Sequence, residues 1–177
     1  MKPSLPPHGR VSRRLAIQLL GTAAISVLNA SRLPGEAQSL ERRVWEAINN
    51  ERRKEGVREL AWDEALAAEA RRHSARMAEA GFFSHFDPVR GDLVPRLNSV
   101  GIPWRDCAEN IILLEEGDED PVAPAVRAWL ASPGHRKNLL NPVYTRSGVG
   151  IAASGDDRLW MTQDFTHWQD FSTSRSR

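Results

Sequence analysis

The chain contains a single cysteine, Cys107, among its 177 residues. One thiol cannot form an intramolecular disulfide, so the fold has to be stabilised by its hydrophobic core. The composition permits this, because 41% of the residues are apolar and 27% are charged, as in soluble globular proteins. At this length a single domain is expected. Cys107 is interpreted as a small, buried apolar side chain, with a reactive or intermolecular thiol as the alternative.

The first thirty residues have the three-part pattern of a signal peptide. Arg13 and Arg14 precede an uncharged apolar stretch, residues 15–28, and small residues follow it. A membrane span takes about 20 residues, so no stable transmembrane span is expected here. Cleavage is predicted after Ala30 or, alternatively, after Ala37; retention of the segment as an anchor is a third outcome.

Ser12-Arg13-Arg14, followed by a moderately apolar segment, resembles a twin-arginine motif, which exports folded proteins and implies a prokaryotic source. An ordinary secretory signal is the alternative, and both predict an extracellular or cell-envelope location.

Four of the 24 basic residues precede Ser31, and without them 20 basic residues remain against 23 acidic ones. This balance argues against a nucleic-acid binder, which usually carries a basic face. The scattered arginines of the helices are expected to lie on a solvated surface, as at Arg71, Arg72 and Arg76.

Residues 31–39 are expected to form a linker and residues 171–177 a flexible tail, which leaves residues 40–170 as the domain. Asp63 is a good N-cap for a helix, and Gly81 is suited to end it. Hydrophobic periodicity and turn residues place the other elements. The predicted helices cover residues 40–55, 64–80, 93–99, 121–131 and 133–140, and the predicted strands cover residues 107–114, 147–153 and 159–165, the last two as a hairpin.

Two histidines, His85 and His135, and one glutamate, Glu109, are candidates for chemistry, whereas a third histidine is set aside. His73 lies on the apolar face of a helix and is expected to be a hydrogen-bonded core residue. His85 lies in a loop among aromatic residues. His135 lies in the first turn of a helix, where the helix dipole disfavours imidazolium, so a neutral ring is expected. Glu109 interrupts an apolar strand and needs partners there, for example backbone N–H groups of a loop.

Several segments around these residues recur in one family, in the same order, and together they cover roughly residues 40–166. They are Ile48-Asn49-Asn50-Glu51-Arg52, Leu60-Ala61-Trp62-Asp63, Ala70 to Met77, Gly81-Phe82-Phe83-Ser84-His85, Ala108-Glu109-Asn110, Trp129 to Arg136, Gly148-Val149-Gly150 and Gln163-Asp164-Phe165. In these segments the chain resembles the CAP superfamily (cysteine-rich secretory proteins, antigen 5 and pathogenesis-related proteins), and in particular its bacterial secreted SCP-like branch. The resemblance implies an α+β fold, a three-layer α-β-α sandwich with a small, mainly antiparallel sheet.

The resemblance also implies a cleft lined by two histidines and two acidic residues. His85 and His135 match the two histidines, and Glu109 matches the first glutamate. Ser132 stands where animal and plant members have the second glutamate. Two histidines and one carboxylate still suffice for a three-ligand Zn²⁺ site with an open position, so His85, Glu109 and His135 are candidate metal ligands. Ser132 is expected to cap a helix, which would occupy its hydroxyl and disfavour a nucleophilic pair with His135.

Three interpretations of this cleft remain, and no catalytic residue is assigned. The first is a non-enzymatic extracellular binding module, whose ligand is a small molecule, a lipid, a cell-wall fragment or a protein. The incomplete set of acidic residues favours it. The second is a metal-dependent, peptidase-like hydrolase that uses His85, Glu109 and His135. In the third, the polar residues only stabilise the fold.

Overall fold

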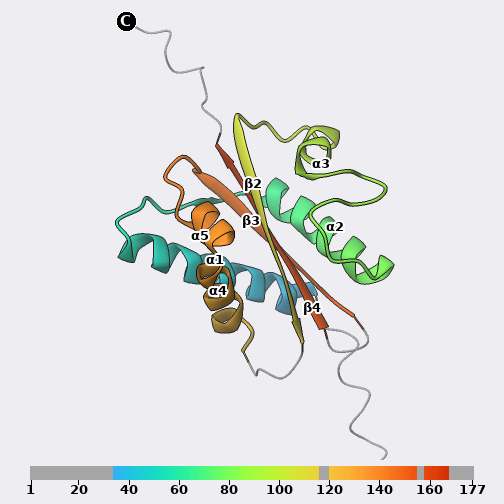
Figure 1. Ribbon diagram of the computed structural model, residues 1–177, viewed down its shortest axis with the longest axis horizontal. Coiled ribbons are helices and arrows are strands. Elements are labelled where there is room, and N and C mark those ends of the chain that lie inside the picture. Colours follow the sequence, from blue (N-terminus) through green and yellow to red (C-terminus); the bar gives the residue numbers. More distant parts are fainter. Residues whose placement is uncertain (1–33, 116–119, 155–157, 168–177) are drawn as a thin grey trace, which may run out of the picture.

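The structure is a computed structural model of the 177-residue chain, and it describes residues 34–115, 120–154 and 158–167 (Figure 1). The expected signal peptide at residues 1–30 and the expected tail at residues 171–177 lie outside these ranges. Within the described ranges, no helix is long and apolar enough to cross a membrane.

The described residues form five helices and four strands in three layers. The strand order of the sheet is β1-β3-β4-β2; β1 runs parallel to β3, and the other neighbours are antiparallel. Helices α2 and α3 cover one face, and α1, α4 and α5 cover the other (Figure 1). The expected three-layer α+β fold is confirmed. The elements are α1 (Pro34–Lys54), β1 (Ala61–Trp62), α2 (Glu64–Ala80), α3 (Leu93–Ser99), β2 (Asp106–Glu115), α4 (Val122–Ala131), α5 (Pro133–Leu139), β3 (Arg146–Ala153) and β4 (Arg158–His167).

Helix α1 begins at Pro34, six residues earlier than expected, so residues 34–39 are helical rather than part of a linker. Proline is well tolerated in the first turn of a helix, where its missing N–H would have no intrahelical partner. Leu40 and Val44 are buried against the sheet and hold the helix in place.

Helix α2 has the bounds and caps that the sequence predicts. The Asp63 carboxylate accepts hydrogen bonds from the backbone N–H groups of Ala65 and Leu66, and Gly81 ends the helix with a φ of 67°. Left-handed backbone of this kind favours glycine. His73, on the inner face, is fully buried as expected, and its Nε2 donates to the carbonyl of Ser84 at 3.0 Å.

Two glycines of β3 let α2 lie directly against the sheet. A Cβ atom added to Gly148 would lie 2.1 Å from the backbone nitrogen of Ala67, and one added to Gly150 would lie 2.0 Å from that of Arg71. Only residues without a side chain fit at such a distance. Helix α2 therefore packs backbone to backbone on β3.

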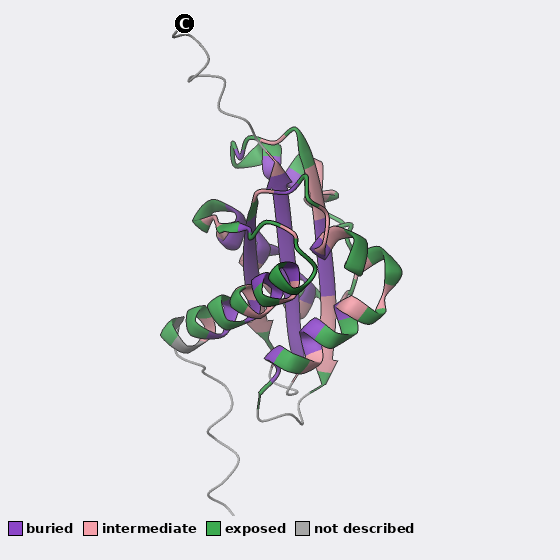
Figure 2. Cartoon of the chain, turned by 90° about the vertical axis from the view of Figure 1, so that its left-hand side faces the viewer, coloured by how far each residue is buried: buried purple, intermediate pink, exposed green. Residues whose placement is uncertain are grey.

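The sheet is buried unevenly, as Figure 2 shows. Strand β4 lies in the centre and is buried along nearly its whole length. Strand β2 lies at the edge and is fully buried only at residues 109–111. The larger core lies between the sheet and the layer of α1 and α4, where Trp129 and Phe165 are fully buried. The partly open edge of β2 is where the candidate site lies.

Candidate functional site

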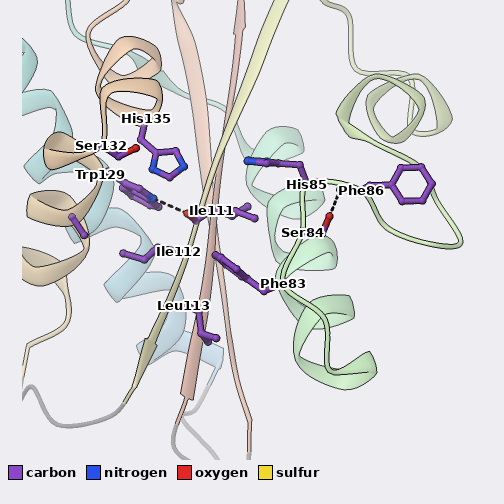
Figure 3. A pocket seen from close by; sticks show the side chains of 11 residues that line it. Phe83, Ser84, His85, Phe86, Ile111, Ile112, Leu113, Trp129, Ser132 and His135 are labelled. Carbon is purple, nitrogen blue, oxygen red and sulfur yellow. Dashed lines mark hydrogen bonds between the residues drawn. The ribbon is translucent and has the colours of Figure 1, made fainter.

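A cleft of about 650 Å³ opens along the outer edge of β2 (Figure 3). The loop after α2 forms one wall, and the end of α4 with the start of α5 forms the other. The lining is mainly apolar, with the two candidate histidines facing each other across it. Its residues are Phe83, Ser84, His85 and Phe86 from the loop, Ile111, Ile112 and Leu113 from β2, and Ala128, Trp129, Ser132 and His135 from α4 and α5.

The loop that carries His85 is fixed by polar contacts at its base. The fully buried Asp87 carboxylate accepts hydrogen bonds from the N–H groups of Val89 and Arg90 and pairs with Arg76 at 3.3 Å. Phe83 points into the cleft toward β2 and Phe86 points away from β2 (Figure 3); the exposed fraction is 49% for Phe83 and 57% for Phe86. Contacts within the chain therefore hold this wall of the cleft in place.

His85 is oriented by Glu109. Its Nδ1 lies 2.8 Å from Oε1 of Glu109, and because the carboxylate accepts, Nδ1 carries the proton. The ring points across the cleft toward His135 (Figure 3). Burial lowers the pKa of His135, and a charge on the neighbouring His85 lowers it further. A neutral His135 agrees with the expectation, although burial, rather than the helix dipole, is the main cause.

Glu109 has different partners from those expected. Side chains, not the backbone N–H groups of a loop, hold its two oxygens: His85 binds Oε1, and Nη2 of Arg96 donates to Oε2. His73 lies 3.8 Å from Oε2. Burial raises the pKa of Glu109, but the hydrogen bond from His85 and the positive charge of Arg96 outweigh it, so the pKa lies below its usual value.

Arg96 links Glu109 to a second buried carboxylate. Arg96 and Glu69 are both fully buried, with Nη1 of Arg96 lying 3.8 Å from Oε1 of Glu69. Glu69 also pairs with Arg72 and Arg90, each at 2.8 Å. Glu69, Arg96, Glu109 and Asp164 are called the buried polar cluster below.

The sequence predicts that the arginines of α2 lie on a solvated surface. In the structure they instead form ion pairs with neighbouring carboxylates. Arg72 pairs with Glu69 of the cluster, and Arg76 pairs with Asp87 of the loop. Arg71 pairs with Glu41 and Glu64. The arginines tie α2 to α1 and to the loop that carries His85.

Asp164 is the fourth member of the cluster and lies directly opposite Glu109 in the register of β4 and β2. It is fully buried, and no described residue donates a hydrogen bond to either of its oxygens. Burial, together with the negative charge of Glu109, raises the pKa of Asp164 well above its usual value. This shift favours the protonated form of Asp164, whose hydroxyl can donate to Glu109.

Replacing Asp164 with asparagine is expected to stabilise the protein at neutral pH. A carboxyl group whose pKa is raised in the folded state contributes stability below its unfolded pKa and loses it as the pH rises toward the folded pKa. We therefore expect Asp164→Asn to match the parent near pH 3 and to be the more stable protein at pH 7, with a difference that grows as the pH rises above the unfolded pKa. Urea unfolding at both pH values measures this. A parent of equal or greater stability at pH 7 would contradict a protonated Asp164.

Ser132 occupies the N-cap position of α5, but its side chain makes no capping hydrogen bond. The expectation that the cap occupies the hydroxyl is wrong. The Ser132 carbonyl accepts from the Arg136 N–H at 2.8 Å, so the first intrahelical hydrogen bond of α5 forms without a bond to the hydroxyl. The hydroxyl lies in the cleft beside His135 (Figure 3), and among the described residues no hydrogen bond joins the two.

The cleft residues do not fit a three-ligand zinc site. Among the described residues, no group of three or more His, Cys, Asp or Glu side chains is arranged to hold a metal ion. Glu109 lies behind His85 with both oxygens already bound, and the guanidinium of Arg96 next to it repels a cation. Of the described residues that line the cleft, His85 and His135 are the ones whose ring nitrogens can bind a metal ion.

Cys107 lies outside this cleft and packs with the small cluster of Leu66, Leu97 and Ile102. Burial and nearby acidic groups raise the pKa of its thiol to about 11. Since the thiolate is the reactive form, the side chain acts as an apolar core residue at neutral pH. This is the interpretation that the sequence favoured.

Known proteins resemble this chain over most of its length. The profile of the CAP family, described as the cysteine-rich secretory protein family, matches residues 45–165. Over 130 residues the chain is 38% identical to the uncharacterised protein YkwD of Bacillus subtilis, a match that covers 73% of this chain and 48% of YkwD. It is also 38% identical over 125 residues to the uncharacterised membrane protein YlbC of the same organism, covering 71% of this chain and 34% of YlbC. The chain thus spans about half of YkwD and about a third of YlbC.

Solved structures show the same fold. An extracellular protein containing an SCP domain from Bacillus anthracis is 30% identical, with a TM-score of 0.67, over 78% of this chain and 45% of that one. An outer surface protein from Borrelia burgdorferi, at 18% identity, shares the fold with a TM-score of 0.68 over 75% of this chain and 96% of its own. Because the family profile covers residues 45–165 and the solved structures share the fold, the chain belongs to the CAP family of cysteine-rich secretory proteins.

Proposed function

We propose that this protein is a non-enzymatic binding module that acts outside the cytoplasm, in the cell envelope or the extracellular space, and that the cleft along β2 is its ligand site. The observation that carries this proposal is a preformed, mainly apolar cleft of about 650 Å³ whose polar groups are few. Ligand sites commonly have this character: apolar walls for affinity and a few polar groups for orientation. The basic, then apolar, N-terminal segment supports the location, as do relatives described as extracellular or outer surface proteins.

The polar residues of the cleft favour binding over hydrolysis. A hydrolase needs a nucleophile or an activated water next to a base. Glu109, the acidic candidate, is held by His85 and Arg96 and is buried behind the wall. The Ser132 hydroxyl makes no hydrogen bond to His135 that would activate it as a nucleophile. The two histidines remain as hydrogen-bonding groups for a ligand.

The cleft ligand is expected to combine an apolar body with a hydrogen-bonding group. Ile112 and Trp129 lie on one side of the β2 edge, and Phe83 lies on the other, so the middle of the cleft presents hydrocarbon and aromatic surface. His85 and His135 face each other at one end (Figure 3). A ligand with its polar group at this end can keep that group hydrogen-bonded while its body leaves water.

A charge placed in the cleft is expected to weaken the binding of an apolar probe. Ala128 is an exposed residue of α4 that lines the cleft, and Ala123 is an exposed residue of the same helix that does not. We expect Ala128→Glu to weaken binding of anilinonaphthalenesulfonate by about tenfold or more, a loss of about 1.4 kcal/mol, and Ala123→Glu to leave it unchanged. Both changes have similar, small effects on helix propensity. A fluorescence titration of the full chain measures this.

The same preparations test the alternative of hydrolysis. We expect no turnover of p-nitrophenyl esters or fluorogenic peptides, with or without added Zn²⁺. Turnover that disappears in His135→Ala would overturn the non-enzymatic proposal. Equal probe binding in Ala128→Glu and Ala123→Glu would show that the cleft is not the ligand site.

A further inference from the structure

The cleft runs along a strand edge that pairs with no other strand among the described residues. Strand β2 stands last in the order β1-β3-β4-β2, so β4 bonds one side of it and the other side faces outward. In an antiparallel strand, the N–H and C=O groups of alternate residues point to opposite sides. One set of residues in β2 therefore bonds to β4, and the other set directs its main-chain groups toward the cleft.

Two side-chain hydrogen bonds identify the outward set. Nε1 of Trp129 donates to the carbonyl of Ile111 at 3.1 Å, and Nδ2 of Asn138 donates to the carbonyl of Glu109 at 3.3 Å. Neither donor belongs to the sheet, so these carbonyls point away from β4. By alternation, the next outward residue is Leu113, which lines the cleft.

The outward edge is covered at one end and open at the other. Trp129 and Asn138 cover the carbonyls up to Ile111. Among the described residues, no side chain or loop bonds to the outward N–H and C=O of Leu113. An exposed edge of this kind is a template for another strand unless it is covered.

The walls beside this edge suit the side chains of an added strand. Successive side chains of a strand point to opposite faces of its sheet. On one face an incoming strand would meet Phe83, and on the other it would meet Ile112 and Trp129 (Figure 3). A chain that pairs with Leu113 would thus place apolar side chains against both walls.

We propose that the ligand of this cleft is an extended polypeptide segment with apolar side chains, which adds a strand to the outer edge of β2. This rests on the function proposed above and names its ligand class. Main-chain hydrogen bonds to the edge, with pockets for alternate side chains, are a common way in which proteins bind peptides. An acyl chain would fill the same walls but would leave the outward groups of Leu113 without partners, which is costly away from water.

Peptides methylated on alternate backbone nitrogens test the proposal. The probes are capped heptapeptides that alternate threonine with leucine, valine or phenylalanine, each titrated into the full chain and followed by calorimetry. For the peptide that binds best, one analogue carries N-methyl groups on its apolar residues and the other on its threonines. Only one of the two sets of N–H groups can point at β2, so we expect one analogue to bind about tenfold or more weaker and the other to bind like the parent peptide.

A change in the protein provides a second test. Leu113→Pro removes the outward N–H but no hydrogen bond to β4, which edge strands tolerate. Leu113→Ala is the matched control, because it removes the same side chain and keeps the N–H. We expect the proline variant to bind the peptide about tenfold or more weaker than the alanine variant. If the proline variant does not fold, hydrogen exchange of the parent protein replaces this comparison. We then expect the added peptide to protect the Leu113 amide from exchange.

The outcomes separate this proposal from the function on which it rests. Equal loss with both methylated analogues would overturn strand addition, as would an unprotected Leu113 amide. If no peptide binds while anilinonaphthalenesulfonate or dodecylphosphocholine binds in a way that Ala128→Glu abolishes, the cleft is a ligand site but not for polypeptide. If no probe binds in the cleft, both proposals fail.

Discussion

Gly150→Ala is expected to lower the free energy of unfolding by about 3 kcal/mol or more. The added methyl carbon would lie 2.0 Å from the backbone nitrogen of Arg71. Since the obstacle is the backbone of α2 and not the end of a flexible side chain, relief requires the helix to move off β3. Gly148→Ala meets the backbone of Ala67 at 2.1 Å and should act in the same way. Urea unfolding followed by circular dichroism measures the change.

Gly134→Ala is the control for this prediction. Gly134 lies in α5, and a Cβ atom added there would have no atom within 4 Å. Because alanine is the better helix former, the control is expected to be neutral or to gain up to about 1 kcal/mol. A loss at Gly150→Ala no larger than at Gly134→Ala would mean that α2 is not packed directly on β3.

Arg96→Met is expected to cost about 3–5 kcal/mol. The guanidinium is fully buried, donates to Glu109 and lies 3.8 Å from Glu69. Methionine leaves these buried carboxylates without the cation between them, and an uncompensated buried charge is far more costly than a lost surface pair. Chemical unfolding at pH 7 measures the loss.

An exposed ion pair gives the comparison for Arg96. Arg43 pairs with Asp120, and about half of each side chain is accessible to solvent, so Arg43→Ala is expected to cost about 0–1 kcal/mol. Adding Glu109→Gln to Arg96→Met should recover part of the loss, because it removes one of the charges that were left unpaired. A loss for Arg96→Met as small as that for Arg43→Ala would contradict the described role of the buried polar cluster.

Much of the fold was predictable because its signals are local. Asp63 and Gly81 mark the ends of α2, and the predicted bounds of α3 are confirmed at both ends. The hairpin of β3 and β4 is also confirmed, since alternation and a turn signal are read along one short segment. The start of α1 differed because Pro34, which suggested a linker, also suits the first turn of a helix.

The candidate site was predictable only in part. The family resemblance pointed to His85, Glu109 and His135, and the structure places His85 against Glu109 and His135 across the cleft. Three members of the buried polar cluster were missed. Glu69 had a signal, since it lies between Leu66 and His73 on the inner face of α2. Arg96 and Asp164 become partners of Glu109 only when three separate elements meet, which no local pattern reveals.

Because the chain has a single cysteine, contacts other than disulfides have to stabilise the fold. A member of a family named for its cysteines has here no disulfide among the described residues and one free thiol. Helix α2 packs directly on β3 at Gly148 and Gly150. The buried polar cluster links α2 and α3 to the sheet. Glu109 and Glu69 of this cluster also bind His85 and Arg90, which fixes the segment that forms one wall of the cleft.

The binding site itself is tested most directly by the backbone amide NMR shifts of the full chain as anilinonaphthalenesulfonate is added. If the cleft is the ligand site, the largest changes will fall on residues 83–86 of the loop, residues 111–113 of β2 and residues 128–135 of α4 and α5. Ala128→Glu should suppress these changes at the same probe concentration. Shifts centred on another surface, or shifts that persist unchanged in Ala128→Glu, would show that the cleft is not the ligand site.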